Sequence, residues 1–184
     1  MKMKFAVLCL AIVAMSAPLL IAGSKDPMVG GAAMYASKDI IDNAVNSKDH
    51  TTLVAAVKAA GLVDTLKSAG PFTVFAPTNE AFAKLPAGTV ETLLKPENKE
   101  MLTKILTYHV VAGRVSAADL KKQIRDGHGQ ATLKTVSGGT LIAMQQGGSI
   151  VLKDEKGGMS TVTIPNVFQS NGVIHVVDTV VLPN

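Results

Sequence analysis

The chain has 184 residues, of which 47% are hydrophobic and 17% charged, with a formal net charge of +4 at pH 7. This composition is typical of a globular protein, and the length fits one domain. The small excess of basic residues is dispersed along the sequence, which argues against a nucleic-acid-binding protein.

The first 24 residues have the pattern of a secretory signal peptide. A short basic head precedes an apolar run that begins at Phe5, and small residues follow it. We predict cleavage after Ser24, with Ala17 and Ala22 as alternative sites. A membrane anchor is the competing interpretation, but a spanning helix needs about 20 apolar residues and Pro18 interrupts this run. The predicted mature protein is therefore secreted or periplasmic, without stable membrane insertion.

The predicted mature chain has no cysteine and little net charge. Cys9 is the only cysteine and lies in the leader, so no disulfide is available to stabilise the fold. Ser24 stands where a lipid-anchored protein needs a cysteine. Without Lys2 and Lys4, 16 basic residues face 14 acidic ones, which leaves a net charge of +2. About 160 residues remain, enough to bury roughly 70% of the surface of the unfolded chain.

The N-terminal third of the mature chain is predicted to be helical. Residues 25–36 are rich in Gly, Ala and Met without a period, and we expect a flexible N-terminal segment there, either a leader strand or a disordered tail. Ser37 is placed to cap the first helix, and Thr51 the second, which Gly61 ends. A short third helix is expected around Leu66.

The first strand is predicted at residues 72–76, where it leads into a helix. Pro77 stops the strand, and Thr78 is placed to cap the amides of the helix that follows. Phe82, in that helix, is expected to face the core.

The middle of the chain continues this pattern. Residues 90–106 are predicted to form two helices that meet at Pro96, followed by a strand from Tyr108 to Val111. Ser116 and Asp119 have the spacing of a capping box for one more helix.

From Gly127 onward the chain is predicted to form an antiparallel meander. Gly-Gly and Asn-Gly pairs separate apolar segments whose composition is typical of strands. These segments cover residues 130–136, 140–145, 149–153, 159–164 and 173–182. Helices early and strands late in the chain favour the α+β class.

Three segments carry distinctive motifs: Thr73–Ala83, Tyr108-His109 and Asn171–Leu182. In this order they resemble the first homology box, the Tyr-His motif and the second homology box of the fasciclin domain. The resemblance covers residues 37–182, and we place the domain at residues 37–184. It implies a wedge-shaped antiparallel β-sandwich with flanking N-terminal helices, in agreement with the α+β class.

Several motif residues are expected to support the fold rather than to bind a partner. Asn171 and Gly172 are predicted to form a hairpin turn through positive φ angles, ahead of a strand buried on both faces. The full set of such structural residues is Thr73, Phe75, Pro77, Thr78, Phe82, Asn171, Gly172, His175 and Asp178.

The sequence has no recognisable catalytic or metal-binding pattern. Its four histidines are too far apart in sequence for a helical or hairpin metal pair, and no cysteine remains after cleavage. No nucleophile elbow, phosphate-binding loop or dinucleotide fingerprint occurs. We therefore predict no enzyme activity, no metal site and no cofactor.

His109 and His175 lie among Val and Ile in predicted strands, where a histidine is usually neutral and hydrogen-bonded. A general base is the alternative role. Asp178 is expected on the opposite face of the strand from His175, so it is predicted to act in a turn or cap. Tyr108 and His109 also remain candidate binding residues, because the resemblance implies that this pair contributes to adhesive surfaces in animal relatives.

A second candidate binding segment precedes the Asn-Gly turn. Animal fasciclin modules that bind integrins resemble one another in an Asp-Ile pair here, whereas this chain has Asn166 and Val167. An amide is a weaker ligand than a carboxylate for a hard cation, so we expect no metal-dependent integrin binding. We expect an exposed loop from Pro165 to Gln169, in which Phe168 either anchors the loop in the core, the role we favour, or contacts a partner.

These observations predict a bacterial, secreted or periplasmic, non-enzymatic fasciclin-domain protein that acts in cell-surface adhesion or protein–protein interaction. The expected partner is a protein or a cell-surface or matrix component. An envelope protein that binds a polysaccharide or small ligand is the first alternative, although the chain has no Trp and only two Tyr to form the aromatic platforms of a sugar site. A hydrolase with a site assembled from remote residues is the second.

Overall fold

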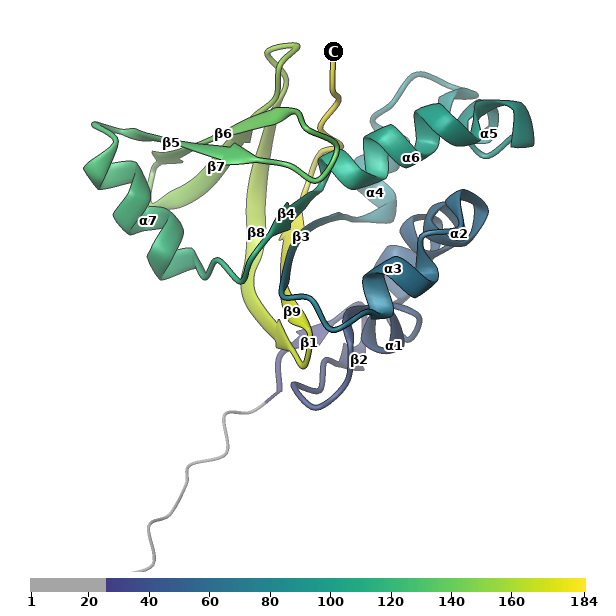
Figure 1. Cartoon of the computed structure of the whole chain (residues 1–184), viewed down its shortest axis with the longest axis horizontal. Coiled ribbons are helices and arrows are strands. Elements are labelled where there is room, and N and C mark those ends of the chain that lie inside the picture. The colour runs from purple at the N-terminus through teal and green to yellow at the C-terminus, as the bar shows by residue number, and fades with distance from the viewer. Residues whose placement is uncertain (1–25) are drawn as a thin grey trace, which may run out of the picture.

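Helices cover one side of a curved sheet in the computed structural model, which describes residues 26–184 (Figure 1). The predicted signal peptide, residues 1–24, lies outside the described residues. The helices are α1 (Ile40–Ala44), η1 (Lys48–His50), α2 (Thr51–Ala60), α3 (Val63–Lys67), α4 (Asn79–Ala83), α5 (Thr89–Leu93), η2 (Pro96–Asn98), α6 (Lys99–Tyr108) and α7 (Ala117–Asp126). The strands are β1 (Met28–Val29), β2 (Ala32–Ala33), β3 (Phe72–Pro77), β4 (Val110–Ala112), β5 (Gln130–Lys134), β6 (Thr140–Gln146), β7 (Ser149–Lys153), β8 (Met159–Gln169) and β9 (Gly172–Val177).

An N-terminal hairpin occupies most of the segment that the sequence predicted to be flexible, residues 25–36. β1 and β2 pair antiparallel, and Gly30 and Gly31 between them both have positive φ, as a two-residue hairpin turn requires. Val29 and Met34 are only 3% and 2% exposed and pack in the core. Two apolar side chains therefore hold this segment in the core, in agreement with the leader strand rather than with the disordered tail.

Most local helix signals agree with the structure. Thr78 caps α4 by accepting a hydrogen bond from the Ala81 amide. Gly61 ends α2 in the left-handed conformation. Ser116 and Asp119 form the predicted capping box of α7.

The observed caps of the first two helices lie one or two residues away from the predicted caps. Asp39 caps α1 in place of Ser37, because its carboxylate reaches the Asp42 amide. Thr51 is the first residue of α2, directly after the short helix η1, rather than its cap.

The sheet has seven strands in the order β4-β3-β9-β8-β7-β6-β5. Neighbouring strands are antiparallel except β3 and β9, which run parallel with Thr73 opposite Val173. The two edges of the sheet meet where Val111 of β4 bridges Thr135, the residue after β5. The sheet therefore curls back on itself, and the parallel pair at its centre was not anticipated from the sequence.

Two hydrophobic clusters lie on opposite faces of β3 and β9. Val74 and Ile174 face the cluster that includes α1, α2 and α6, whereas Phe75 and Val177 face the interior of the curled sheet, which α7 covers. All six residues of β9 are buried. The prediction of a strand buried on both faces is thus confirmed.

Tyr108 and His109 lie at the end of a helix, not in the strand predicted from Tyr108 to Val111. Tyr108 is the last residue of α6 and His109 is its C-cap. The helical spacing of Leu102, Ile105 and Leu106 continues to position 109, which places His109 on the buried face of the helix.

Residues 165–169 belong to β8 rather than to an exposed loop. The pairing of β8 with β9 shifts register on both sides of Ile164, and Asn166 has a φ of +60°. Val167 is 1% exposed, whereas Phe168 is 40% exposed. The expectation that Phe168 anchors this segment in the core is therefore wrong, because the side chains of a strand alternate and Val167 takes the inward position.

The connection from β8 to β9 is tight, but it does not use the expected positive φ angles. Among the described non-glycine residues only His128 and Asn166 have positive φ. Gly172 is required for space instead, because a Cβ atom at this position would lie 2.2 Å from the Phe72 carbonyl oxygen.

Candidate functional site

The Tyr108 hydroxyl joins two backbone segments inside the protein. It donates a hydrogen bond to the Thr140 carbonyl at 2.6 Å and accepts one from the Glu155 amide at 3.2 Å. Burial raises the pKa of Tyr108 to about 12, and the carboxylates of Glu155 and Asp154 act in the same direction. The hydroxyl therefore stays protonated and serves as a fixed crosslink.

The His109 ring is fully engaged by the backbone. The Val181 amide donates to Nε2 at 3.2 Å, and Nδ1 lies 2.8 Å from the Ile105 carbonyl oxygen. Because Nε2 accepts, the proton is on Nδ1, which donates to Ile105. Burial lowers the pKa of His109 to about 4, so the ring is neutral at pH 7.

His175 and Asn166 form a second buried connection. The backbone amide of Asn166 donates to Nδ1 of His175 at 3.3 Å, and Nε2 of the ring donates to the Val115 carbonyl at 2.9 Å. The ring stacks on Phe75 with centroids 5.6 Å apart, and burial lowers its pKa. The Asn166 side chain in turn accepts from the Ala117 amide, the first of α7, at 2.7 Å.

The contacts of Asp178 are different from those of the His175 ring. Its carboxylate accepts from the Thr161 amide at 2.8 Å and from the Thr179 hydroxyl at 3.1 Å. Lys84 lies 3.7 Å from the same carboxylate at the surface. Asp178 follows directly after β9, so these contacts are those of a turn, the role predicted for it, although the strand alternation used in that prediction ends at Val177.

Asn171 links three elements that are far apart in the sequence. Its side-chain oxygen accepts from the Ile40 amide, the first of α1, at 3.1 Å. Its side-chain amide donates to the carbonyls of Leu66 and Ser68, at the end of α3, at 2.7 and 2.9 Å. The sequence pointed to Asn171 as a turn residue and did not indicate this role.

Sequence reasoning also missed a buried amide pair beside this turn. Asn43 and Gln169 are 0% and 2% exposed, and the Asn43 side chain donates to the Gln169 side-chain oxygen. Asn43 also holds both backbone groups of Tyr35, at 3.0 and 2.8 Å. The only available signal was polar residues at positions that helix and strand periods place in the core.

Hydrogen bonds of Thr73 and Arg114 fix the loop between β4 and α7. The Thr73 hydroxyl donates to the Gly113 carbonyl at 2.6 Å and accepts from the Val115 amide at 2.8 Å. The Arg114 guanidinium between them donates to the carbonyls of Gln169 and Ser170, at 2.8 and 3.1 Å.

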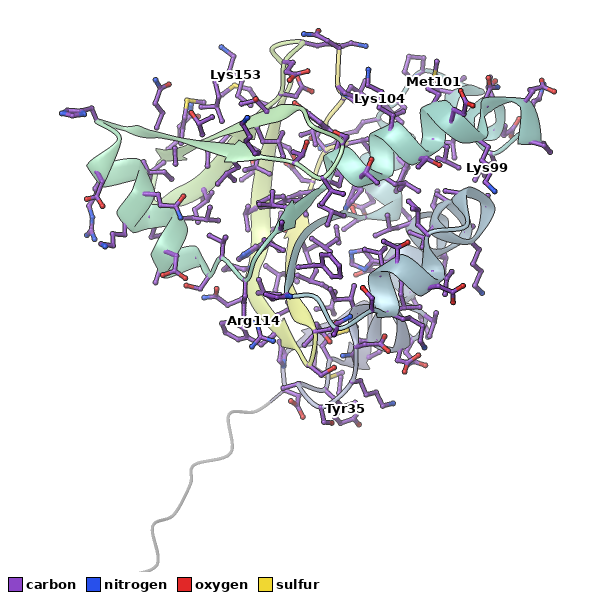
Figure 2. All side chains as sticks on the ribbon, viewed as in Figure 1. Tyr35, Lys99, Met101, Lys104, Arg114 and Lys153 are labelled. Carbon is purple, nitrogen blue, oxygen red and sulfur yellow. The ribbon has the colours of Figure 1, made fainter. Side chains whose placement is uncertain are left out.

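Exposed aromatic and basic side chains therefore gather around the β8–β9 turn. The Lys38 carbonyl accepts from the Ser170 amide at 2.9 Å, and the Lys38 ammonium lies 5.1 Å from the centre of the Tyr35 ring. Figure 2 shows Tyr35 and Arg114 at the same end of the molecule, far from Met101. We call this surface the β8–β9 end and define it as Tyr35, Lys38, Arg114 and Phe168.

The candidate binding residues differ in their exposure. Tyr108, His109 and Val167 are buried, Asn166 is half-buried, and Phe168 is exposed. Among residues 26–184, no three His, Cys, Asp or Glu side chains lie close enough together to hold a metal ion. In the same part of the chain, no helix is long and apolar enough to cross a membrane.

The family profile described as "Fasciclin domain" matches residues 48–183, which is most of the chain. The chain belongs to the fasciclin domain family. The resemblance seen in the homology boxes and the Tyr-His motif is confirmed, and so is the expected fold class.

Bacterial relatives match this chain over 66–81% of their own length. Protein sll1483 of Synechocystis is 48% identical over 159 residues, covering 86% of this chain and 81% of that protein. Immunogenic protein MPB70 of Mycobacterium bovis is 39% identical over 145 residues, covering 76% of this chain and 66% of that protein.

Animal relatives match over a smaller part of their length. Transforming growth factor-beta-induced protein ig-h3 of Sus scrofa is 35% identical over 131 residues, which is 71% of this chain and 17% of that protein. A solved pair of fasciclin domains from the insect cell adhesion molecule Fasciclin I has the same fold, with a TM-score of 0.70 at 20% identity. This chain covers about half of that pair, 51%, with 79% of its own length.

Proposed function

We propose that this protein is exported to the periplasm or beyond the cell, where it acts without catalysis in cell-surface adhesion or protein–protein interaction. The β8–β9 end carries the proposal, because two aromatic and two basic side chains from β8, the β4–α7 loop and the segment before α1 are exposed around this turn. The fold is shared with a protein named as a cell adhesion molecule, which supports the same class of role. The proposed partner is a protein or a cell-surface or matrix component.

The composition of the β8–β9 end suits protein recognition. Tyr, Phe and Arg are enriched at the energetic centres of protein interfaces. Arg114 and the Lys38 backbone are already hydrogen-bonded to the turn, so little conformational freedom is lost when a partner binds. The two cations favour a partner with an acidic surface.

The buried candidates act on this surface through the fold. Val167 and Gln169 point into the protein on either side of Phe168 and so direct its ring outward. Tyr108 and His109 make their contacts inside the molecule, with the Thr140 carbonyl and the Val181 amide respectively. In this proposal Phe168 contacts the partner, whereas Asn166 and Val167 position the Phe168 side chain.

The proposal is tested by attachment of cells of the producing organism to immobilised protein. We expect the double variant Tyr35→Ser, Phe168→Ser to reduce attachment at least tenfold without lowering the melting temperature. Met101→Ser, which removes an equally exposed apolar side chain from a remote surface, is the matched control and should attach as the unmodified protein does. Equal attachment by the double variant would refute the assignment of this surface.

Two further measurements separate the alternatives. A glycan array tests binding of envelope polysaccharides, and saturable binding that survives the double substitution would favour a sugar site elsewhere. A hydrolase panel with an active-site-directed probe tests catalysis, and labelling of a nucleophile would overturn the non-enzymatic assignment.

A further inference from the structure

An internal cavity of about 60 Å³ lies between the helices α1, α2, α3 and α6 and the strands β3 and β9. Aliphatic side chains form nearly all of its wall, among them Ile41, Leu53, Val57 and Ile174. One water needs roughly 10–15 Å³ and two to four polar partners, so the cavity has room for several waters and almost nothing to bind them. Its size and its wall favour a small apolar occupant.

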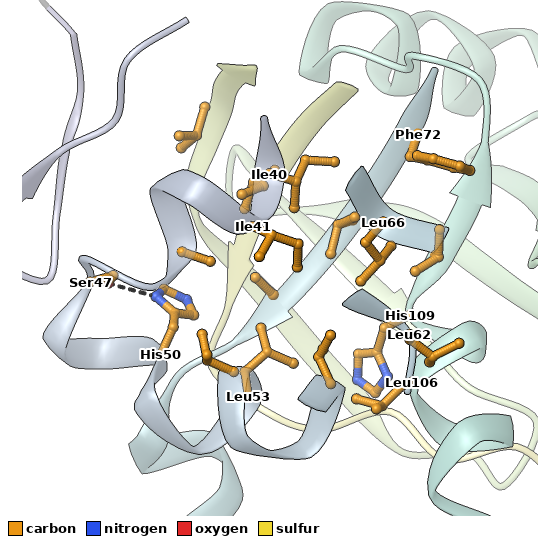
Figure 3. A pocket seen from close by; sticks show the side chains of 18 of the residues that line it. Ile40, Ile41, Ser47, His50, Leu53, Leu62, Leu66, Phe72, Leu106 and His109 are labelled. Atoms are coloured by element: carbon orange, nitrogen blue, oxygen red, sulfur yellow. Dashed lines mark hydrogen bonds between the residues drawn. The ribbon is translucent and has the colours of Figure 1, made fainter. Parts of the chain in front are cut away.

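One polar atom in this wall is unpaired. His50 is 3% exposed, and its Nε2 has no hydrogen-bond partner among the described residues. Its Nδ1 lies 2.9 Å from the Ser47 hydroxyl, which fixes the ring (Figure 3). The His109 ring also lines the cavity, but its two nitrogens are bonded to Ile105 and Val181. His50 therefore offers the one unsatisfied polar contact of the described wall.

The His50 ring is neutral, which restricts the kind of group it can bind. Burial lowers its pKa, and this outweighs the opposing influences of the Ala76 backbone and of the Asp49 carboxylate. A carboxylate ligand would find no positive charge on this ring. A hydroxyl group suits Nε2 in either tautomer, because it both donates and accepts hydrogen bonds.

The cavity meets solvent on the side away from His50. Leu62 and Phe72 are half-buried, and Thr65 and Val136 are exposed, although all four line the cavity. Figure 3 shows Leu62 and Phe72 across the pocket from His50 and Ser47. A ligand that entered on this side would place its far end next to His50.

We propose that this cavity binds a small, neutral, apolar molecule with one hydroxyl group, which hydrogen-bonds Nε2 of His50 while the apolar part fills the aliphatic pocket. The site lies inside the helical side of the fold and shares no residue with the β8–β9 end. Val167 lines the cavity and also flanks Phe168, so the two proposals are tested by separate measurements.

Phenol and toluene test this proposal, because they have the same size and differ in the hydroxyl group. Each is titrated into the full protein while the methyl NMR signals of Ile41, Leu53 and Val57 are followed. We expect both probes to shift these signals and phenol to bind about three to ten times more tightly. Phenol binding no more tightly than toluene, or no shift of these methyl signals with either probe, would overturn the proposal.

Three variants separate the hydrogen bond from the cavity itself. His50→Phe keeps a ring of similar size without Nε2 and should abolish the preference for phenol while toluene still binds. Ala44→Leu adds bulk to the cavity wall and should weaken both probes, and it provides a test even if His50→Phe does not fold. His128→Asn removes an exposed histidine and should change neither affinity. A preference for phenol that persists in folded His50→Phe would show that Nε2 is not the contact.

Discussion

His109 couples stability to pH, because near neutral pH only the unfolded chain can protonate it. Its pKa is about 4 in the folded protein, against about 6.5 in an unfolded chain. As the pH falls from 6.5 towards 4, the unfolded state binds a proton that the folded state does not, so folding becomes less favourable. The stabilisation is complete above pH 6.5, and its loss amounts to about 3 kcal/mol.

Urea denaturation at pH 7.5 and at pH 5 measures this effect. We expect a lower free energy of unfolding at pH 5, with contributions in the same direction from His50 and His175, whose pKa values burial also lowers. His109→Gln should show a smaller difference between the two pH values, whereas the exposed control His128→Asn should keep the full difference. Identical stability of the unmodified protein at both pH values would contradict a neutral, buried His109.

Tyr108→Phe tests the crosslink made by the buried hydroxyl. The substitution leaves the Thr140 carbonyl and the Glu155 amide without this partner, and we expect it to lower the free energy of unfolding by about 1–3 kcal/mol. Tyr35→Phe, at an exposed position, is the matched control and should change it by less than about 0.5 kcal/mol. A similar loss in both variants would argue against the crosslink.

Asn166→Asp introduces the carboxylate that the animal integrin-binding motif contains. Because this side chain already accepts from the first amide of α7, the carboxylate is expected to bind the helix N-terminus rather than a metal. We expect a gain of up to about 1 kcal/mol at pH 7, lost again as the pH falls through the carboxyl pKa. Integrin binding, measured with and without chelator, should stay absent in both proteins, and chelator-sensitive binding by the variant would contradict this placement.

At the scale of elements, Asn171 joins the start of α1, the end of α3 and the start of β9. We expect Asn171→Ala to lower the free energy of unfolding by about 3 kcal/mol, because two buried backbone groups and one partly buried group lose their partner. Asn98→Ala removes one exposed bond to the Thr92 carbonyl and serves as the control. Thermal unfolding followed by circular dichroism measures both, and equal melting temperatures would show that the turn alone, without the side chain, docks the helices.

Elements whose signals are local were predictable, and those set by distant contacts were not. Thr78, Ser116 and Gly61 act on amides or carbonyls within four residues, so their spacing in the sequence suffices. The β1–β2 hairpin depends instead on a core to which the whole chain contributes. Position 109 shows the competition most directly, since a run of Val after it indicated a strand while the face of α6 extended the helix to Tyr108.

The candidate site shows the same limit. The residues of the homology boxes and the Tyr-His motif could be named from the sequence. Asp178 was expected in a turn, where it lies, but the strand alternation used for that expectation does not apply because β9 ends at Val177. Phe168 was assigned to the wrong side because the register shift around Ile164 leaves no mark in the composition. The β8–β9 end and the cavity beside His50 each combine residues more than a hundred positions apart, so neither had a sequence signal.

At the scale of the whole molecule, the curled sheet divides the interior into two separate hydrophobic clusters. One is enclosed by the sheet and α7, and the other lies under the early helices and contains the cavity. β3 and β9 contribute to both clusters, and successive residues of a strand face opposite sides. A change of side-chain size in either strand therefore affects only the cluster that the substituted residue faces. The proposed ligand cavity lies on the helical side of β3 and β9, and the proposed adhesive surface lies where β8 turns into β9.

The position of β9 in the sheet has a consequence for the export proposed above. β9 is the last strand in the sequence, yet it lies between β3 and β8 and supplies the parallel partner of a strand about a hundred residues earlier. Until residues 172–177 are available, β3 lacks its parallel partner. The helices already synthesised also lack the part of their packing surface that β9 supplies. A chain threaded through a membrane channel from its N-terminus would therefore stay unfolded, and so remain transportable, until nearly all of it has crossed.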